Sequence, residues 1–511
     1  MSGASLLWFA RHEIRLAWRD AAAVLFGGSL PRRIVGATIL ALLVLVFHAF
    51  AYSFVAEALR NGIRPDPRTL VFITGSALLS WCLLLSQAIE SVTRGFYARG
   101  DLDLIISSPM PAHSLFAVRI GGIAAAASLM ASVLATPVIN VLVLLDGPHW
   151  LLAYVALIAL GILACACAVA VTAGLFRLLG PARTRFAAQV VAAIVGAAFA
   201  IGIQAVAILS FDDPSRIAVL TSDWLVARAP PLDSPIWIPA RALLGEPASL
   251  AWLAGGSLLL LVAVVATVAP RFASHAVAAA GSASGPARKG AGHARFRART
   301  AARVLREKEW TLLLRDPWLI SQTLMQILYL VPAALLLWRS FGEGHNTLAV
   351  LVPVLVMASG QLAGGLAWLA VSGEDAPDLV RTAPVAPRQV VRAKIEAVLG
   401  AVGIAVAPLT IAVSAISPQI AFVAGCGIAI SAASATAIQL WFRSQARRSQ
   451  FRRRQTSSRI ATFAEAFSSI LWACAAAFAA QGIWLLAAMT GLVCALMLAG
   501  IRAMSPRPVA A

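Results

Sequence analysis

Charged residues are scarce in this chain. Aspartate, glutamate, lysine and arginine make up 12% of its 511 residues, against about 25% in a soluble domain, and 60% of the residues are hydrophobic. Lysine occurs only at Lys289, Lys308 and Lys394. None of the three follows a glycine-rich loop, and the sequence holds no G-x-x-x-x-G-K-[ST] phosphate loop. We therefore expect this chain neither to bind nor to hydrolyse ATP by itself.

The patterns of a metal centre, a disulfide framework and a catalytic site are lacking as well. The seven histidines show no metal-ligand spacing. All six cysteines lie in apolar segments, where we expect them to behave as small apolar side chains. We find no nucleophile paired with a base. The sequence therefore predicts a protein that is not an enzyme and has no cofactor of its own.

Long apolar segments dominate the chain. A helix needs about 20 apolar residues to cross the bilayer core, and a helix is expected because lipid offers no partner to unpaired backbone groups. Twelve segments qualify: Ile34–Val55, Thr69–Ile89, Ile120–Leu145, Leu151–Leu175, Ala187–Leu209, Leu250–Ala269, Leu319–Leu337, Leu348–Val371, Ile395–Ile416, Ile420–Trp441, Ile460–Ala480 and Ile483–Ile501. The predicted fold class is an all-α polytopic membrane protein with about 12 transmembrane helices.

The distribution of basic residues predicts the orientation of these helices. With a cytosolic N-terminus, 34 of the 41 lysines and arginines fall in cytosolic segments, which is the positive-inside bias. Both termini are then cytosolic. We interpret the densest basic run, Arg443–Arg459, as an anchor near anionic headgroups rather than as an RNA-binding segment. The lipid bilayer is thus an expected partner, and nucleic acid is not.

Arginine outnumbers lysine 38 to 3, which is typical of a GC-rich bacterial genome. The predicted location is the bacterial inner (cytoplasmic) membrane. No A-x-A-like cleavage site follows the first apolar segment, so we expect Ile34–Val55 to remain as a membrane anchor.

An amphipathic segment precedes the first and the seventh predicted span. In Leu6–Asp20, apolar residues line one face of a helix and arginines at four-residue spacing line another, as in a helix lying along the membrane interface. An ordinary helix in a soluble tail is the alternative. Val304–Asp316 resembles this segment. The two copies match Glu13 with Glu309, Arg19 with Arg315, and Asp20 with Asp316.

A second motif follows the second span of each half. RGDLDLIISSPMP (Arg99–Pro111) and SGEDAPDLVRTAPVAP (Ser372–Pro387) match at Asp103 with Asp378, Pro109 with Pro384, and Arg119 with Lys394 just beyond. An aspartate cap and a proline stop predict a short helix parallel to the membrane. The candidate docking residues are Asp101, Asp103, Leu104, Ile105, Ser107, Ser108 and Pro109 in the first copy, and Glu374, Asp375, Asp378, Leu379, Val380 and Pro384 in the second.

These repeats divide the chain into two tandem six-helix units, residues 1–269 and 304–511. A basic linker rich in glycine and alanine, residues 270–303, joins them.

Both motifs resemble parts of type 2 ABC-exporter permeases. Arg99–Pro109 resembles the E/R-x-G-x-L-x-x-L-x-x-x-P signature after the second span of that family, and Lys308–Pro317 resembles its elbow helix. The resemblance implies elbow helices, six-span units, and coupling helices that dock on a separate cytosolic ABC ATPase, in two copies, which binds the ATP. Two features depart from the family pattern: Glu374–Pro377 replaces its glycine-leucine region, and both units share one chain.

The function that the resemblance implies is that of the membrane-spanning permease subunit of an ATP-driven exporter. The alternative is a secondary transporter of the major facilitator type, which also has six plus six spans and a basic central loop. The expected elbow helices and the lack of an acid deep in the membrane favour the permease. The transported substrate is not encoded in any pattern that we recognise.

His48 and Glu465 are polar residues within the predicted spans. His48 lies well inside a span without a carboxylate beside it, so we interpret it as an interhelical hydrogen-bonding residue rather than a proton relay. Glu465 lies in the first turns of its span, and we expect its side chain to reach the membrane interface.

Overall fold

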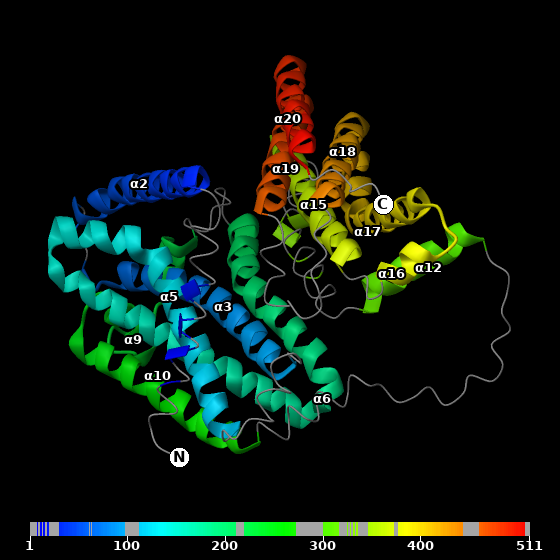
Figure 1. The fold of residues 1–511 in the computed structure, drawn as a ribbon. Coiled ribbons are helices and arrows are strands. Elements are labelled where there is room, and N and C mark those ends of the chain that lie inside the picture. The colour runs from blue at the N-terminus through cyan, green and yellow to red at the C-terminus, as the bar shows by residue number, and fades with distance from the viewer. Residues whose placement is uncertain are drawn as a thin grey trace. The chain divides into compact units, whose positions relative to one another are not determined.

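We used a computed structural model of the chain, shown in Figure 1. It describes residues 30–60, 64–97, 112–210, 219–271, 300–315, 346–372, 377–442 and 459–505, with Gly62 and scattered residues of 8–19 and 324–335. Every regular element in these ranges is a helix.

Ten of the described helical segments are long and apolar enough to cross a membrane. They are Pro67–Phe96, His113–Asp146, Pro148–Gly180, Arg183–Ile208, Pro247–Val268, Leu351–Val371, Pro387–Ile416, Pro418–Phe442, Phe463–Ala480 and Trp484–Ala503, and each overlaps one of the twelve predicted spans. The first predicted span, Ile34–Val55, lies within helix α2. The seventh, Leu319–Leu337, falls mostly outside the described residues. The chain is therefore an all-α, multi-pass membrane protein, and the count of twelve stays a prediction.

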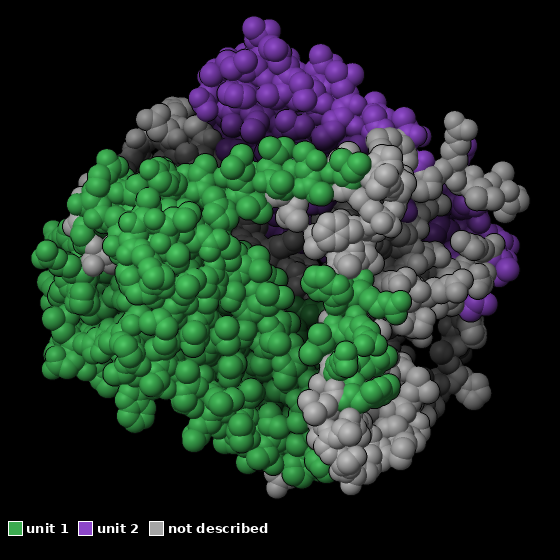
Figure 2. All heavy atoms as spheres, turned by 60° about the vertical axis from the view of Figure 1, so that its left-hand side comes forward, with its two compact units in different colours: residues 1–203, 214–289 green, residues 204–213, 290–511 purple. Residues whose placement is uncertain are grey.

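The chain separates into two compact units (Figure 2). The first comprises residues 1–203 and 214–289, and the second comprises residues 204–213 and 290–511. The predicted linker, residues 270–303, lies mostly outside the described residues, and the predicted unit boundaries stay predictions.

The first unit contains long helices and several short ones. Its elements are α2 (Leu30–Arg60), α3 (Pro67–Tyr97), α5 (Ala112–Asp146), η1 (Pro148–Leu151), most of α6 (Leu152–Ser210), α8 (Asp223–Val226), η2 (Pro235–Trp237), α9 (Ile238–Leu243), α10 (Pro247–Val268) and η3 (Ala269–Arg271). Helix α6 contains two spans, because Gly180 has a positive φ of 70° that breaks the helical path. A residue with a side chain would be strained in this conformation.

The second unit contains α12 (Ala301–Arg315), α15 (Asn346–Ser372), α16 (Pro377–Thr382), α17 (Pro387–Ile416), α18 (Pro418–Phe442), α19 (Arg459–Ala480) and α20 (Trp484–Met504). Helix α15 packs against α17, α18 and α19, and α20 packs against α19 (Figure 1). Because α12 packs against both α15 and α17, the predicted second elbow helix is part of this bundle.

Proline marks the start of several of these helices. Pro67, Pro247, Pro387 and Pro418 are the first residues of α3, α10, α17 and α18. The first helical position needs no hydrogen-bond donor, and the fixed φ of proline suits it. The chain therefore encodes these boundaries locally.

The helices pack closely through small side chains. At Gly161 in α6, an added Cβ would lie 2.6 Å from the backbone nitrogen of Ser128 in α5, so only glycine permits this contact. Ser128 donates from its hydroxyl to the carbonyl oxygen of Ile158 at 3.0 Å across the same interface. Small residues at helix contacts and such interhelical hydrogen bonds are typical of membrane bundles.

Large apolar side chains cover much of the outside of both units. Leu178 is 82% exposed, Trp252 is 74% exposed, and Phe422 is 73% exposed. Apolar patches of this kind are rare on soluble proteins, whereas lipid covers them in a membrane. The cores lie between the helices, as the buried Phe96, Phe116 and Ile89 illustrate in unit 1.

Candidate functional site

The predicted docking helix of the second unit is present as α16, a short helix between α15 and α17. Asp378, Leu379 and Val380 lie in it, and Pro384 lies in the bend that follows. The side chain of Leu379 is 72% exposed, so the helix presents an apolar residue to its surroundings. Glu374 and Asp375 lie outside the described residues, as do all seven docking residues predicted in the first copy, between Asp101 and Pro109.

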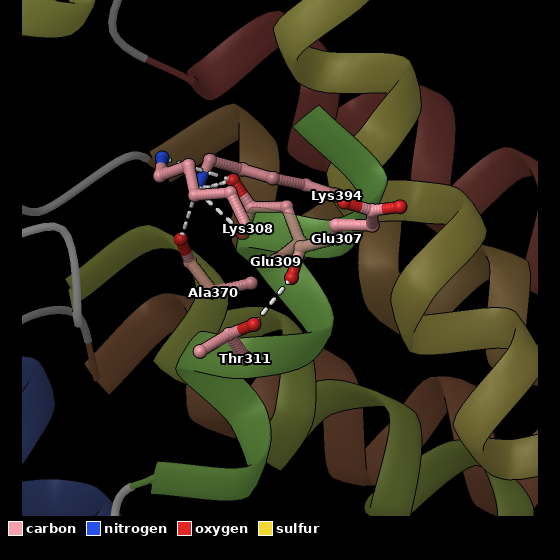
Figure 3. Close-up of polar contacts among 6 residues, drawn as sticks. All are labelled: Glu307, Lys308, Glu309, Thr311, Ala370 and Lys394. Carbon is pink, nitrogen blue, oxygen red and sulfur yellow. Dashed lines mark hydrogen bonds and ion pairs between the residues drawn. The ribbon is translucent and has the colours of Figure 1, made fainter. Parts of the chain in front are cut away.

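A fully buried carboxylate lies in α12, the helix that packs against α15 and α17. Glu309 of α12 is 0% exposed, and the ammonium group of Lys394 in α17 lies 3.0 Å from its Oε1 and 3.1 Å from its Oε2. The ammonium group of the neighbouring Lys308 lies 3.2 Å from Oε1. Lys394 is itself only 11% exposed. Two ammonium groups therefore contact one buried carboxylate, and Figure 3 shows these contacts.

Lys394 also contacts the helix that precedes the predicted docking segment. Its ammonium group donates a hydrogen bond to the carbonyl oxygen of Ala370, near the end of α15 (Figure 3). One side chain thus joins α12, α15 and α17, and the last two flank α16 on either side along the chain. We call Glu309, Lys394, Lys308 and the Ala370 carbonyl the ion-pair clamp.

The clamp has to be complete to be stable. Removing an ion from water costs several kcal/mol, and only close partners with satisfied hydrogen bonds offset that cost. The Glu309 carboxylate makes three contacts with ammonium groups within 3.2 Å, and Lys394 also donates a hydrogen bond to the backbone carbonyl of Ala370. Breaking a pair of this kind leaves an uncompensated buried charge.

Apolar packing holds α12 in position around the clamp. Leu313 is 4% exposed and belongs to the core of the second unit. The ring of Trp310 lies against Gly400 of α17, where an added Cβ would be 3.2 Å from the ring. The predicted elbow helix is thus fastened by two side chains next to the buried charge. Of its other predicted residues, Arg315 ends α12 and Asp316 lies outside the described residues.

A second group of ion pairs lies at the surface of α17. Glu396 pairs with Arg306 of α12 and accepts a hydrogen bond at 2.8 Å from Arg392 one turn away. Arg392 is 78% exposed, so solvent screens this pair and its contribution to stability is small. Arg392 and Glu396 line a shallow groove on the first turns of α17, with Pro387, Arg388, Val391 and Ile395.

Unit 1 contains a contact equivalent to part of the clamp. Arg119 of α5 donates from Nη1 to the carbonyl oxygen of Gly95 in α3 at 3.4 Å. Arg119 and Gly95 are 24 residues apart, as are Lys394 and Ala370. Arg119 and Lys394 are also the pair that the sequence repeat matches. The helices before and after the two predicted docking segments are therefore joined by a basic side chain in both halves.

The first predicted elbow helix is described only in part. Its residues Trp8, Ile14 and Trp18 are helical and between 67% and 71% exposed, and Arg19 is also exposed. Glu13 and Asp20 lie outside the described residues, so the counterpart of Glu309 stays a prediction.

The interpretation of His48 is confirmed. Its Nε2 lies 3.4 Å from the amide nitrogen of Asn140 in α5, and Tyr154 of α6 donates to the Asn140 side-chain oxygen at 2.9 Å. His48 of α2 thus takes part in a hydrogen-bonded group that joins three helices of unit 1.

The expectation for Glu465 needs correction. Its carboxylate does not simply extend to the interface but packs against the backbone of α15 at Gly364 and accepts a hydrogen bond from Gln439 of α18. Sequence reasoning missed this contact because each residue looks ordinary alone. The available signal was a pair of glycines one helical turn apart, Gly360 and Gly364, in a stretch of α15 rich in small residues.

No group of three metal-ligand side chains occurs among the residues that the structure describes. The chain matches no protein-family model, and comparisons with curated proteins and with solved structures find no significant match.

Proposed function

We propose that this chain is the membrane-spanning permease subunit of an ATP-driven exporter of the ABC type, and that α16 docks on the separate ATPase subunit. The observation that carries the proposal is the ion-pair clamp, which ties α12 to the helices on both sides of an exposed short helix. In this proposal the ATPase binds ATP on the cytosolic side, in two copies, one for each docking segment.

The ion-pair clamp is suited to transmitting a movement of α16 to the membrane helices. Two sites are coupled when a rigid element that both can bias connects them. A displacement of α16 would act on α15 and α17 together, because α16 lies between them along the chain and Lys394 of α17 is hydrogen-bonded to Ala370 of α15. The exposed Leu379 and the charged groove at the start of α17 would supply an apolar and a polar contact to the partner.

The proposal is tested by isolating tagged chain from its native membrane. We expect a soluble ATPase to copurify, and we expect the chain stripped of that partner to hydrolyse no ATP. The variant Leu379→Asp should reduce the amount of copurified ATPase, because it places a charge in the apolar contact. Leu232→Asp is the matched control, since Leu232 is also exposed but lies on the predicted outer side.

The first docking segment is tested in the same assay. Proline at Ile105 would break the predicted helix at a cost of about 3 kcal/mol, and we expect a larger loss of copurified ATPase than from Leu379→Asp. Unchanged copurification in both variants would contradict docking at these segments. ATP hydrolysis by the isolated chain would contradict the proposal that a separate subunit hydrolyses ATP.

One observation favours the alternative, a secondary transporter of the major facilitator type. Glu465 lies inside the membrane-spanning stretch Phe463–Ala480 and packs between helices, and an ionisable group in such a position is a common feature of ion-coupled transporters. Uptake or efflux in vesicles driven by a pH gradient without ATP would support this alternative over the permease.

A further inference from the structure

The side chain of Glu465 occupies a space that α15 leaves open. Its carboxyl carbon lies 1.9 Å from the position that a Cβ on Gly364 would take, so any larger residue at position 364 would collide with it. Gln439 of α18 donates from Nε2 to Oε2 of Glu465 at 2.7 Å. Three helices of unit 2, α15, α18 and α19, therefore meet at one carboxyl group.

No basic side chain compensates this carboxyl group within the described part of the chain. Helices α15 and α18 carry no charged residue at all. The only other charged residue of α19 is Arg459 at its start, and the only one of α20 is Arg502, whose guanidinium lies over the Trp441 ring at 5.3 Å. The described ion pairs do not include Glu465.

The remaining titratable groups of these helices do not provide a counter-charge either. The thiols of Cys426 and Cys474 are exposed, and that of Cys494 contacts the hydroxyl of Ser468. The helix α17, which also packs on α15, uses Lys394 in the ion-pair clamp. A single amide donor does not offset the cost of holding an anion between membrane helices.

A second polar contact lies one turn away on α15. At Gly360, the hydroxyls of Ser431 and Ser469 both lie 2.4 Å from where a Cβ would be. Ser469 donates to the backbone carbonyl of Glu465 at 2.9 Å, whereas the Ser431 hydroxyl, 1% exposed, has no hydrogen-bond partner. Within the described residues, the interface of α15 thus holds a hydroxyl without a hydrogen-bond partner near an acid without a basic partner.

We propose that Glu465 is a proton-binding site of the membrane bundle. A proton is the cation that this geometry accepts, because the carboxyl group is in contact with backbone at Gly364 and no three metal-ligand side chains converge among the described residues. The bound proton comes from water, forms an O–H bond on the carboxyl group, and returns to water on release. Glu465 is partly exposed, which gives it a path for that exchange.

Proton binding would then favour the packed arrangement of α15, α18 and α19. A ligand that binds one arrangement better than another shifts the population toward it. The neutral acid fits the closed contact at Gly364, and the carboxylate favours an arrangement with more water around it. The inference does not depend on whether ATP or an ion gradient drives transport.

The test is infrared spectroscopy of the full chain in lipid vesicles. We expect the carbonyl band of a protonated carboxylic acid at neutral pH, with a shift in heavy water, and we expect Glu465→Gln to remove it. Glu396→Gln is the matched control, because Glu396 is paired with two arginines and should contribute to the carboxylate bands only. A wild-type spectrum without the acid band, or one unchanged in Glu465→Gln, would overturn the proposal.

Two further variants separate the site from general packing. Gly364→Ala should displace the carboxyl group and shift or abolish its band, whereas Gly365→Ala, where a Cβ has nothing within 4 Å, should leave it unchanged. Glu465→Gln imitates the neutral acid and should keep the thermal stability of the wild type at neutral pH. A large loss of stability in that variant would indicate a carboxylate held by a cation, which also contradicts the proposal. The measurement needs neither ATP nor a partner, so its failure leaves the permease proposal untouched.

Discussion

Replacing Lys394 by methionine is the sharpest test of the ion-pair clamp. Methionine keeps most of the apolar stem of the side chain and removes only its charge. Glu309 stays 0% exposed and loses the contacts at 3.0 and 3.1 Å, but it keeps the contact with Lys308 at 3.2 Å. Leaving a buried charge with no partner typically costs about 3–5 kcal/mol, and because Lys308 still contacts Glu309, we expect Lys394→Met to lower the free energy of unfolding by less than that amount but by more than an exposed pair contributes.

The assay is thermal or denaturant unfolding of the purified chain in detergent, followed by a probe of helix content. Arg392→Ala is the matched control, because that arginine forms an exposed ion pair on the same helix and should have a small effect. The double variant Glu309→Gln with Lys394→Met removes both charges. It should be more stable than the sum of the two single losses predicts, since neither charge is then left alone.

Two results would refute this reasoning. An effect of Lys394→Met as small as that of Arg392→Ala would mean that the carboxylate of Glu309 reaches water or another cation. Losses of the two single variants that simply add in the double variant would mean that the residues do not act as a pair. Lys394→Arg should behave nearly as wild type, because unit 1 has an arginine, Arg119, at the matching position.

Two other predictions concern the topology and a helix cap. A cysteine introduced at Ser234 should react with a membrane-impermeant thiol reagent in intact cells, and one at Gln450 should not; the reverse pattern would overturn the orientation that the basic residues predict. Asp66 accepts a hydrogen bond from the backbone of Thr69 at 2.8 Å at the start of α3, and its hydrogen bonds with Thr69 hold the pKa of Asp66 below its usual value. Asp66→Ala should therefore cost about 1 kcal/mol at neutral pH. The difference in stability from the wild type should vanish as the pH falls through that lowered pKa. The reason is that a carboxyl group whose pKa is lowered in the folded state stabilises the protein above its unfolded pKa and no longer does so below its folded pKa. A stability difference that persists in acid would contradict the cap.

The spans were readable from the sequence because their signal is local. Twenty consecutive apolar residues describe a span without reference to any other segment, and ten of the predicted segments reappear as membrane-length helices. Proline at the first turn, as at Pro387 and Pro418, likewise marks helix starts locally. The repeat also directed attention to Glu309 and Lys394, but it matched each to a residue in the other half rather than to one another.

The contacts that side chains make between helices could be found only from the tertiary structure. Glu309 and Lys394 are 85 residues apart, and Gln439 and Glu465 are 26 apart, so no local pattern pairs them. Hydropathy assigned Glu465 to the interface because it lies near the start of its span, whereas the bare backbone of Gly364 makes room for its carboxyl group between helices. Whether an ionisable side chain is buried depends on the helices that pack around it. Those helices come from distant parts of the chain and are brought together only in the folded structure.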